Sequence, residues 1–272
     1  MYENISRYTN EDIDRILSRE LGRKYDIYRE RWASANAGNA PAFPVHIDFE
    51  LIDKCNQRCT MCPRNTKTHP RINYKLNTGS VLGLSDYKRI IDEGFSNALM
   101  SVNLGAFAEP LLNKDVFRMV EYARTKGVID TRLITNGLLL HKYTEEIFDS
   151  GLVNLFVSLD AFSEEKYKHI RGRGFKQVKA NLISFLEEKR SRKSLLPIVR
   201  VSFVDMDANR GEREDFINFW RDKVDIIDIQ VFDNFNIDIN GPYDRMRKKK
   251  WICKSPWARV TVLSNQEILP CC

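Results

Sequence analysis

Residues 45–62, VHIDFELIDKCNQRCTMC, place an apolar run directly before three closely spaced cysteines. Residues 45–52 have the length and the Val, Ile and Phe content of a buried strand. Cys55, Cys59 and Cys62 then follow with the spacing C-x3-C-x2-C. Functional loops of α/β folds leave the C-terminal ends of strands. The stretch therefore predicts a metal-binding loop at the end of the first strand of an α/β domain.

Apolar runs and amphipathic stretches alternate through the rest of the chain. Five further runs have strand character, at residues 98–104, 131–135, 153–159, 198–204 and 226–232. Helical patterns lie at residues 85–94, 114–126, 144–149, 175–190 and 212–221. Six βα units build a parallel sheet, and both an open doubly wound sheet and a partial barrel accommodate them.

The two ends of the chain differ from this central pattern. Residues 4–35 have helical spacing, with Thr9 as a candidate cap ahead of Glu11 and Asp12, and residues 36–44 form a linker rich in small residues and proline. We therefore expect an N-terminal helical segment and linker at residues 1–44, a core at residues 45–240, and a small C-terminal extension at residues 241–272.

Composition limits the classes of function. The 272 residues are 43% hydrophobic and 29% charged, as in a folded soluble protein, and no apolar run is long enough to cross a membrane. No segment resembles an export signal, which favours the cytoplasm. The net charge of +6 falls in short runs such as residues 245–250, so nucleic acid is an unlikely partner.

The six cysteines fall into two groups, which favours metal binding over disulfides. Three thiolates in one short loop can ligate three irons of a [4Fe-4S] cluster and leave the fourth iron open. Two alternatives remain at this point. One is a zinc site completed by His69, and the other is a set of three unrelated thiols.

The loop from Cys55 to Cys62, with Met61 before its last cysteine, resembles the signature of the radical S-adenosylmethionine (SAM) superfamily. The six βα units are similar to the partial (β/α)6 barrel of that superfamily. The resemblance implies a [4Fe-4S] cluster whose open iron binds SAM. It also implies that one electron cleaves SAM to a 5′-deoxyadenosyl radical, which then abstracts a hydrogen atom from a substrate.

Two strand ends carry segments that resemble SAM-contacting motifs of the superfamily. Residues 105–110, GAFAEP, resemble the GGEP segment, with Ala108 in place of the second glycine. This implies that Glu109 and Pro110 lie at the amino group of SAM, although Glu-Pro also marks helix starts. Residues 135–137 are similar to a TNG segment, which implies that Asn136 borders the cofactor.

The next two strands supply further candidates for SAM binding. Residues 157–160, VSLD, resemble a segment that reaches the ribose or methionyl part of SAM, which implies contacts from Ser158 and Asp160. Helix capping is the alternative role for both side chains. Arg171 and Arg200 could each pair with the SAM carboxylate through a forked hydrogen bond, and solvated arginines are the alternative.

The C-terminal extension has an apolar hairpin pattern at residues 260–269, between Cys253 and the pair Cys271 and Cys272. It resembles the opening of the auxiliary-cluster extension called SPASM, or its short form twitch. This implies that the three cysteines ligate a second [4Fe-4S] cluster. Gln266 stands where that pattern has glycine, and the remaining ligands are missing. We therefore expect the sequence to be a fragment of a longer protein; the alternatives are a reduced extension that binds a second cluster incompletely, and a set of inert thiols.

The expected substrate is a small polar molecule such as a sugar or an aminocyclitol, and a ribosomally made peptide is the alternative. A reductase, flavodoxin or ferredoxin would supply the electron. His141 and Asp233 follow the third and sixth strands and are candidate acids or bases. A hypothesis of another class is a non-catalytic iron-sulfur or zinc module, which would need none of the SAM-like strand ends.

Overall fold

The computed structural model describes residues 5–9, 11–62, 64, 79–232 and 255–270. The strands are β1 (Ile5–Thr9), β2 (His46–Phe49), β3 (Ser101–Leu104), β4 (Asp130–Thr135), β5 (Asn154–Ser158), β6 (Ile198–Asp205), β7 (Ile226–Val231), β8 (Arg259–Val262) and β9 (Ile268–Leu269). The α-helices are α1 (Ile13–Leu21), α2 (Arg23–Ala37), α3 (Leu84–Ser96), α4 (Val116–Thr125), α5 (Thr144–Asp149), α6 (Glu164–Ile170), α7 (Phe175–Ser191), α8 (Arg213–Trp220) and α10 (Ser255–Ala258). Three short 3-10 helices are η1 (Pro110–Leu112), η2 (Leu140–Lys142) and η3 (Arg210–Glu212).

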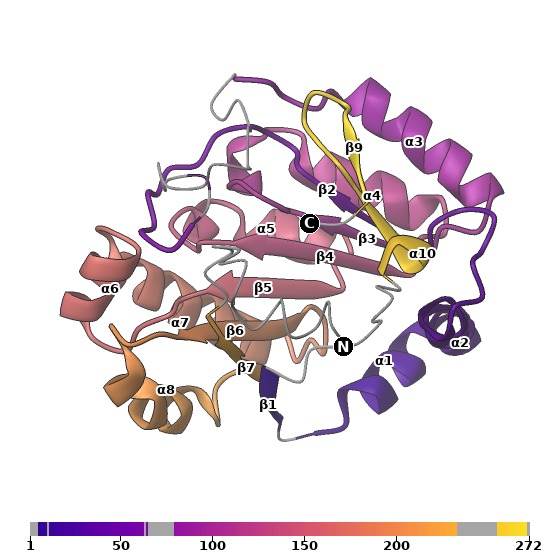
Figure 1. Ribbon diagram of the computed structural model, residues 1–272. Helices are drawn as coiled ribbons and strands as arrows, with labels where there is room; N and C mark the ends of the chain where they lie inside the picture. The colour runs from indigo at the N-terminus through magenta and orange to yellow at the C-terminus, as the bar shows by residue number, and fades with distance from the viewer. Residues whose placement is uncertain (1–4, 10, 63, 65–78, 233–254, 271–272) are drawn as a thin grey trace, which may run out of the picture.

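One mostly parallel sheet organises these elements, in the order β1-β7-β6-β5-β4-β3-β2-β8-β9 (Figure 1). Strands β2 to β7 are parallel and follow chain order, as expected for consecutive βα units. The order begins at β1 and ends at β9, so the described strands form an open partial barrel. This confirms the predicted α/β fold and its six core strands.

The two faces of the sheet have opposite chemistry. Alternate residues of the core strands pack under the surrounding helices, and these are apolar: Ile47, Phe49, Val102, Leu104, Leu133, Leu155, Val157, Val199, Val201, Phe203, Ile227 and Ile229. The intervening residues line a cavity of about 660 Å³ on the inner face. They are mostly polar, for example Asp48, Asn103 and Arg132. The period-2 alternation thus separates an apolar outer layer from a polar interior.

The N-terminal helices close the end of the barrel at which the strands begin, called the floor below. Apolar residues at the starts of five strands, Val45, Ile129, Val153, Ile198 and Ile226, pack in one cluster with Leu17 of α1 and Tyr25, Tyr28 and Ala35 of α2. Helix α10 packs on α2 beside them (Figure 1). The opposite ends of the strands are left for the cysteine loop.

The prediction for the N-terminal end of the chain needs correction, and the one for the C-terminal end needs an addition. Residues 5–9 were expected to be helical with Thr9 as a cap, but they form β1, which pairs antiparallel with β7. The cap of α1 is Asp12, whose carboxylate accepts a hydrogen bond from the Arg15 backbone. At the other end the predicted hairpin is present as β8 and β9, and β8 also adds a parallel strand beside β2.

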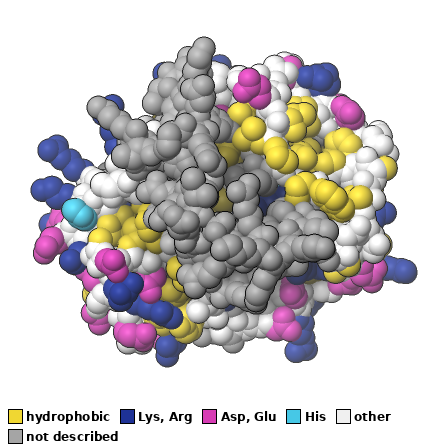
Figure 2. All heavy atoms as spheres, in the orientation of Figure 1, with side chains coloured by type: hydrophobic (Ala, Val, Ile, Leu, Met, Phe, Trp, Pro, Cys, Tyr) yellow, Lys and Arg dark blue, Asp and Glu magenta, His cyan; other side chains and the backbone are white. Residues whose placement is uncertain are grey.

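Charged side chains of both signs surround the face shown in Figure 2, without a large area of one sign among its coloured atoms. Such a surface differs from the basic stripe of a nucleic-acid-binding face. None of the helices in the described ranges combines the length and apolar character needed to cross a bilayer.

Candidate functional site

The cysteine loop leaves β2 and is held by three other parts of the chain. The backbone N–H of Thr60 donates to the carbonyl of Ile170 at the end of α6, with a distance of 2.8 Å. The carbonyl of Lys54 accepts from the N–H of Glu109 at 3.1 Å, and the N–H of Asp53 donates to Ser80 at 2.9 Å. Contacts on several sides position the loop at the C-terminal ends of the strands, as the sequence predicted.

The three thiols differ in exposure: Cys55 is exposed, Cys62 is half-buried and Cys59 is buried. Burial raises the pKa of Cys59 to about 11, although the nearby Arg171 guanidinium opposes this. The Cys59 thiol must therefore lose a proton when it ligates iron, as metal-bound cysteines do.

Two side chains direct N–H groups toward these sulfurs. Arg171 Nη1 lies 3.9 Å from Cys59 Sγ. Asn136 Nδ2 lies 3.9 Å from Cys55 Sγ and donates to Asn56 Oδ1 at 2.7 Å. Hydrogen bonds to sulfur are one way in which proteins tune iron-sulfur clusters. Three soft thiolates with N–H donors around them fit a [4Fe-4S] cluster.

A single-ion site is not assembled in the described ranges, where no three His, Cys, Asp or Glu side chains converge closely enough to hold one metal. His69, the fourth ligand of the zinc alternative, lies outside the described residues. A cubane instead spreads its cysteines over separate irons.

Glu109 lies beside the loop and is completely enclosed. Its carboxylate accepts hydrogen bonds from Thr135 Oγ1 at 2.7 Å, from the Asn136 N–H at 2.8 Å and from the Leu111 N–H at 3.2 Å. Burial nevertheless raises its pKa to about 7. Glu109 therefore fixes the TNG turn and the start of η1, whose first residue is Pro110, and its role toward SAM remains a prediction.

Gly105, the first residue of this segment, stands where the backbone requires glycine. Its φ is +125°, and a Cβ added there would lie 2.5 Å from the Ile134 carbonyl oxygen. The backbone of β3 thus turns against β4 where only glycine fits. Ala108 lies farther along the loop and is half-buried.

Asp160 and Arg171 form a buried ion pair. Asp160 is completely enclosed and has a φ of +59°. Its carboxylate accepts from Arg171 Nε at 2.7 Å and from the Val204 N–H at 2.9 Å. The solvated alternative for Arg171 is therefore wrong, because its side chain is only 9% exposed. Arg171 joins this pair to the loop through its contact with Cys59.

The remaining predicted residues lie in different surroundings. Ser158 ends β5 opposite Ser202 of β6 and is half-buried. Arg200 lines the cavity and pairs with Asp228 at 3.3 Å, with its pKa lowered to about 10 by burial and by Arg132. His141 is exposed on η2 and does not line the cavity. Asp233, Cys253, Cys271 and Cys272 lie outside the described residues.

A second ion-pair network beside the loop was not found by sequence reasoning. Arg64 Nη1 donates to Glu50 Oε1 at 2.7 Å, and Nη2 of the same guanidinium contacts Asp53. The other oxygen of Glu50 accepts from the N–H and hydroxyl of Ser264, just beyond β8, at 3.2 and 2.9 Å. Glu50 thus connects the cysteine loop to the C-terminal hairpin.

Comparison with known proteins agrees with this arrangement. The model of the radical SAM superfamily matches residues 49–202, from the end of β2 to β6. This chain therefore belongs to the radical SAM superfamily, which assigns it a [4Fe-4S] cluster and SAM as cofactors.

Two curated relatives extend the match without settling the activity. GTP 3′,8-cyclase of Alkaliphilus metalliredigens is 28% identical over 225 residues, which cover 82% of this chain and 62% of that protein. A probable GTP 3′,8-cyclase of Methanocaldococcus jannaschii is 30% identical over 197 residues, covering 72% and 62%. This chain thus spans about three fifths of the length of each relative.

A solved structure shares the fold. SuiB of Streptococcus suis, bound to SAM, superposes with a TM-score of 0.62 at 15% identity, covering 91% of this chain and 64% of that one. At this level of identity the likeness concerns the architecture alone.

Proposed function

We propose that this chain cleaves SAM reductively and uses the resulting radical to abstract a hydrogen atom from a small polar substrate. The observation that carries the proposal is the cysteine loop at one end of a barrel whose interior is polar. A non-catalytic cluster module would need the loop but not a cavity of about 660 Å³, which lies in the usual range for small-molecule sites.

When bound, the reduced cluster supplies the electron that splits SAM into methionine and the 5′-deoxyadenosyl radical. The chain itself binds and orients: Cys55, Cys59 and Cys62 would hold three irons, and Arg171 and Asn136 direct N–H groups at two of the sulfurs. Ser158 and Arg200 are proposed contacts for SAM.

The charges of the cavity bear on the class of substrate. Arginines and carboxylates line it in near balance, namely Arg7, Arg29, Arg132, Arg200 and Arg259 with Glu11, Asp12, Asp14, Asp48, Asp130 and Asp228. A balanced lining suits neutral or zwitterionic polar groups, as in sugars and aminocyclitols. This favours a small polar substrate over one with several negative charges.

GTP cyclisation is the second candidate, because the two curated relatives carry that name. A triphosphate would require a local excess of arginine or lysine, which the described lining lacks as a whole. Modification of a ribosomally made peptide is a third candidate.

The proposal also includes an electron donor and a second cluster. A reductase, flavodoxin or ferredoxin would reduce the cluster, and Cys253, Cys271 and Cys272 would ligate a second cluster. Replacing Cys253 by alanine should then lower the iron bound per chain without removing the cluster of the cysteine loop. Unchanged iron content would contradict the second cluster.

The activity is tested by anaerobic reconstitution, followed by dithionite reduction with SAM and detection of 5′-deoxyadenosine. The control is the triple variant Cys55→Ala, Cys59→Ala, Cys62→Ala. Deoxyadenosine from the wild type alone is the expected result. If the wild type forms a cluster and binds SAM but releases no deoxyadenosine, the chain acts as a non-catalytic module.

A further inference from the structure

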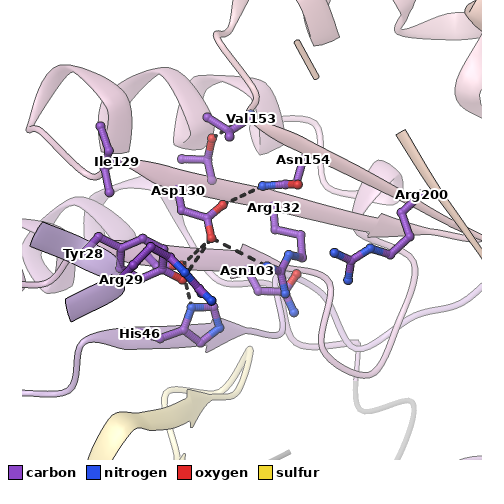
Figure 3. A network of polar contacts seen from close by, with 12 residues as sticks. Tyr28, Arg29, His46, Asn103, Ile129, Asp130, Arg132, Val153, Asn154 and Arg200 are labelled. Atoms are coloured by element: carbon purple, nitrogen blue, oxygen red, sulfur yellow. Dashed lines mark hydrogen bonds and ion pairs between the residues drawn. The ribbon is translucent and has the colours of Figure 1, made fainter. Parts of the chain in front are cut away.

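Three polar residues stand side by side on the inner face of the barrel. Asp48 of β2 is in register with Asn103 of β3, and Asn103 is in register with Arg132 of β4. All three line the cavity (Asn103 and Arg132 are labelled in Figure 3). We call Asp48, Asn103 and Arg132 the interior row.

Each member of the interior row keeps one buried polar atom without a hydrogen-bond partner in the described residues: Asp48 Oδ2, Asn103 Oδ1 and Arg132 Nε. Other atoms of the row have partners, and Arg132 Nη2 lies 3.6 Å from Asp130 Oδ2. Asp48 Oδ1 accepts from Asn103 Nδ2 at 2.8 Å and lies 3.2 Å from His46 Nε2. Asp48 Oδ2 forms an ion pair with Arg259 Nη1 at 3.8 Å, beyond hydrogen-bonding distance. The row therefore offers two acceptors followed by one donor.

The neighbouring carboxylate of Asp130 differs from the row, because its hydrogen bonding is complete within the described residues. Both carboxylate oxygens of Asp130 have partners: Asn154 donates to Oδ1 at 2.8 Å, and Tyr28 and Ser101 donate to Oδ2 at 3.1 and 3.3 Å (Figure 3). Buried polar groups normally find partners, and those that do not destabilise the fold. The interior row therefore keeps hydrogen-bonding capacity that the described residues leave unused.

The charge state of the row is also defined. Burial opposes ionisation of Asp48, but His46, the hydrogen bond from Asn103 and Arg259 outweigh it and hold its pKa well below the usual range. Asp48 is therefore a carboxylate near neutral pH, so its free oxygen accepts a hydrogen bond. Arg132 is a donor at any physiological pH.

We propose that the interior row is a recognition site for a ligand edge that presents two N–H or O–H donors beside one acceptor. The donors would meet Asp48 and Asn103, and the acceptor would meet Arg132. As a substrate site the row rests on the proposed function, whereas as a binding site it does not.

Two sources carry this chemistry. The hydrogen-bonding edge of guanine has two adjacent N–H donors and a carbonyl oxygen. An amino sugar or aminocyclitol presents an ammonium group and a hydroxyl as donors and a further hydroxyl oxygen as acceptor. In both, the group opposite Asp48 is a nitrogen donor, so its removal is the most direct probe of recognition.

The test is calorimetric titration of the reconstituted, SAM-loaded chain under anaerobic conditions. One pair of probes is GTP and ITP, which lacks the 2-amino donor, and the other is glucosamine and glucose. We expect the member with the amino group to bind about tenfold tighter, or more, in one pair. The pair that shows this difference identifies the source.

Substitutions in the interior row test whether Asp48 and Arg132 contact the bound probe. Asp48→Asn and Arg132→Met should each weaken the bound probe about tenfold or more. The matched control is Tyr87→Phe, because the Tyr87 hydroxyl is also buried without a partner in the described residues but does not line the cavity. It should bind the probe as the wild type does. Circular dichroism confirms that each variant is folded.

Failure of the inference is separable from failure of the proposed function. If neither pair shows a preference, or if the row variants bind as tightly as Tyr87→Phe, the recognition site is disproved, whatever the deoxyadenosine assay gives. A selective probe on a wild-type chain that releases no deoxyadenosine would overturn the enzyme proposal and leave the binding site.

Discussion

Two regions of the barrel interior differ in how completely their buried polar side chains are hydrogen-bonded by the chain itself. Beside the cysteine loop, Glu109 accepts three hydrogen bonds and Asp160 is paired with Arg171. Toward the floor, Asp48, Asn103 and Arg132 each keep a buried atom without a partner in the described residues. A network satisfied internally can hold a loop in place before any cofactor binds. A network that is left open has hydrogen-bonding capacity to offer a ligand, as we propose for the interior row.

The largest expected effect is at the buried pair. Arg171→Met should lower the free energy of unfolding by about 3–5 kcal/mol, because it leaves the Asp160 carboxylate buried without its cation. Urea unfolding of the cluster-free protein measures this. The matched control is Arg192→Met on the surface, where Arg192 pairs with Glu145 and Glu188 and little change is expected. Equal losses in the two variants would contradict the contrast.

Glu109 should make stability depend on pH. Its pKa is raised from 4.5 to about 7 in the folded chain, so the folded state holds its proton more tightly than the unfolded state. Stability from this group is present below about pH 4.5 and is lost as the pH rises to about 7, by at most about 3 kcal/mol. Urea midpoints of the wild type should fall across this range relative to those of Glu109→Gln. Parallel profiles would contradict the prediction.

Replacing Gly105 by alanine should lower stability, whereas the same replacement at Gly211 should not. Gly105→Ala should cost about 2 kcal/mol, because the added Cβ meets the Ile134 carbonyl and the backbone has a positive φ. Gly211→Ala is the control, since nothing lies within 4 Å of the added Cβ. Thermal unfolding compares the two, and a similar melting temperature in both would show that the β3 turn relaxes.

The smallest expected difference in stability is between valine variants of two threonines. Thr135→Val removes a hydroxyl that donates to Glu109 and should cost about 1.5 kcal/mol. Thr261, in register with Asp48, has a buried hydroxyl without a partner in the described residues. Thr261→Val should therefore leave stability unchanged or raise it. A loss as large as that of Thr135→Val would mean that the Thr261 hydroxyl is engaged.

The sequence predicted the six core strands well, because buried parallel strands are short apolar runs bounded by turn residues. It also located the cysteine loop, whose spacing is local information. It did not predict β1, since Ile5–Thr9 is a strand only through pairing with β7 from the far part of the chain. The same holds for β8, whose parallel pairing with β2 has no local signal.

The roles of single side chains were harder to predict for the same reason. Arg171 looked like a surface residue because nothing nearby in the sequence is its partner; Asp160 reaches it through a turn with positive φ. The interior row did leave a signal, because polar residues alternate with apolar ones in His46-Ile47-Asp48-Phe49 and in Ser101-Val102-Asn103-Leu104. That pattern indicates a strand with one polar face, but it does not show which atoms remain without partners.

The pairing of β8 with β2 has a consequence for how the protein is made. β2, which leads into the cysteine loop, is flanked by β3 on one edge and by β8 on the other. During synthesis the first edge is covered early, but the second stays open until residues 259–262 have left the ribosome. Ser264, which completes the hydrogen bonding of Glu50 under the loop, emerges later still. A nascent chain that stops before β8 therefore exposes an unpaired edge of the strand that leads into the cysteine loop.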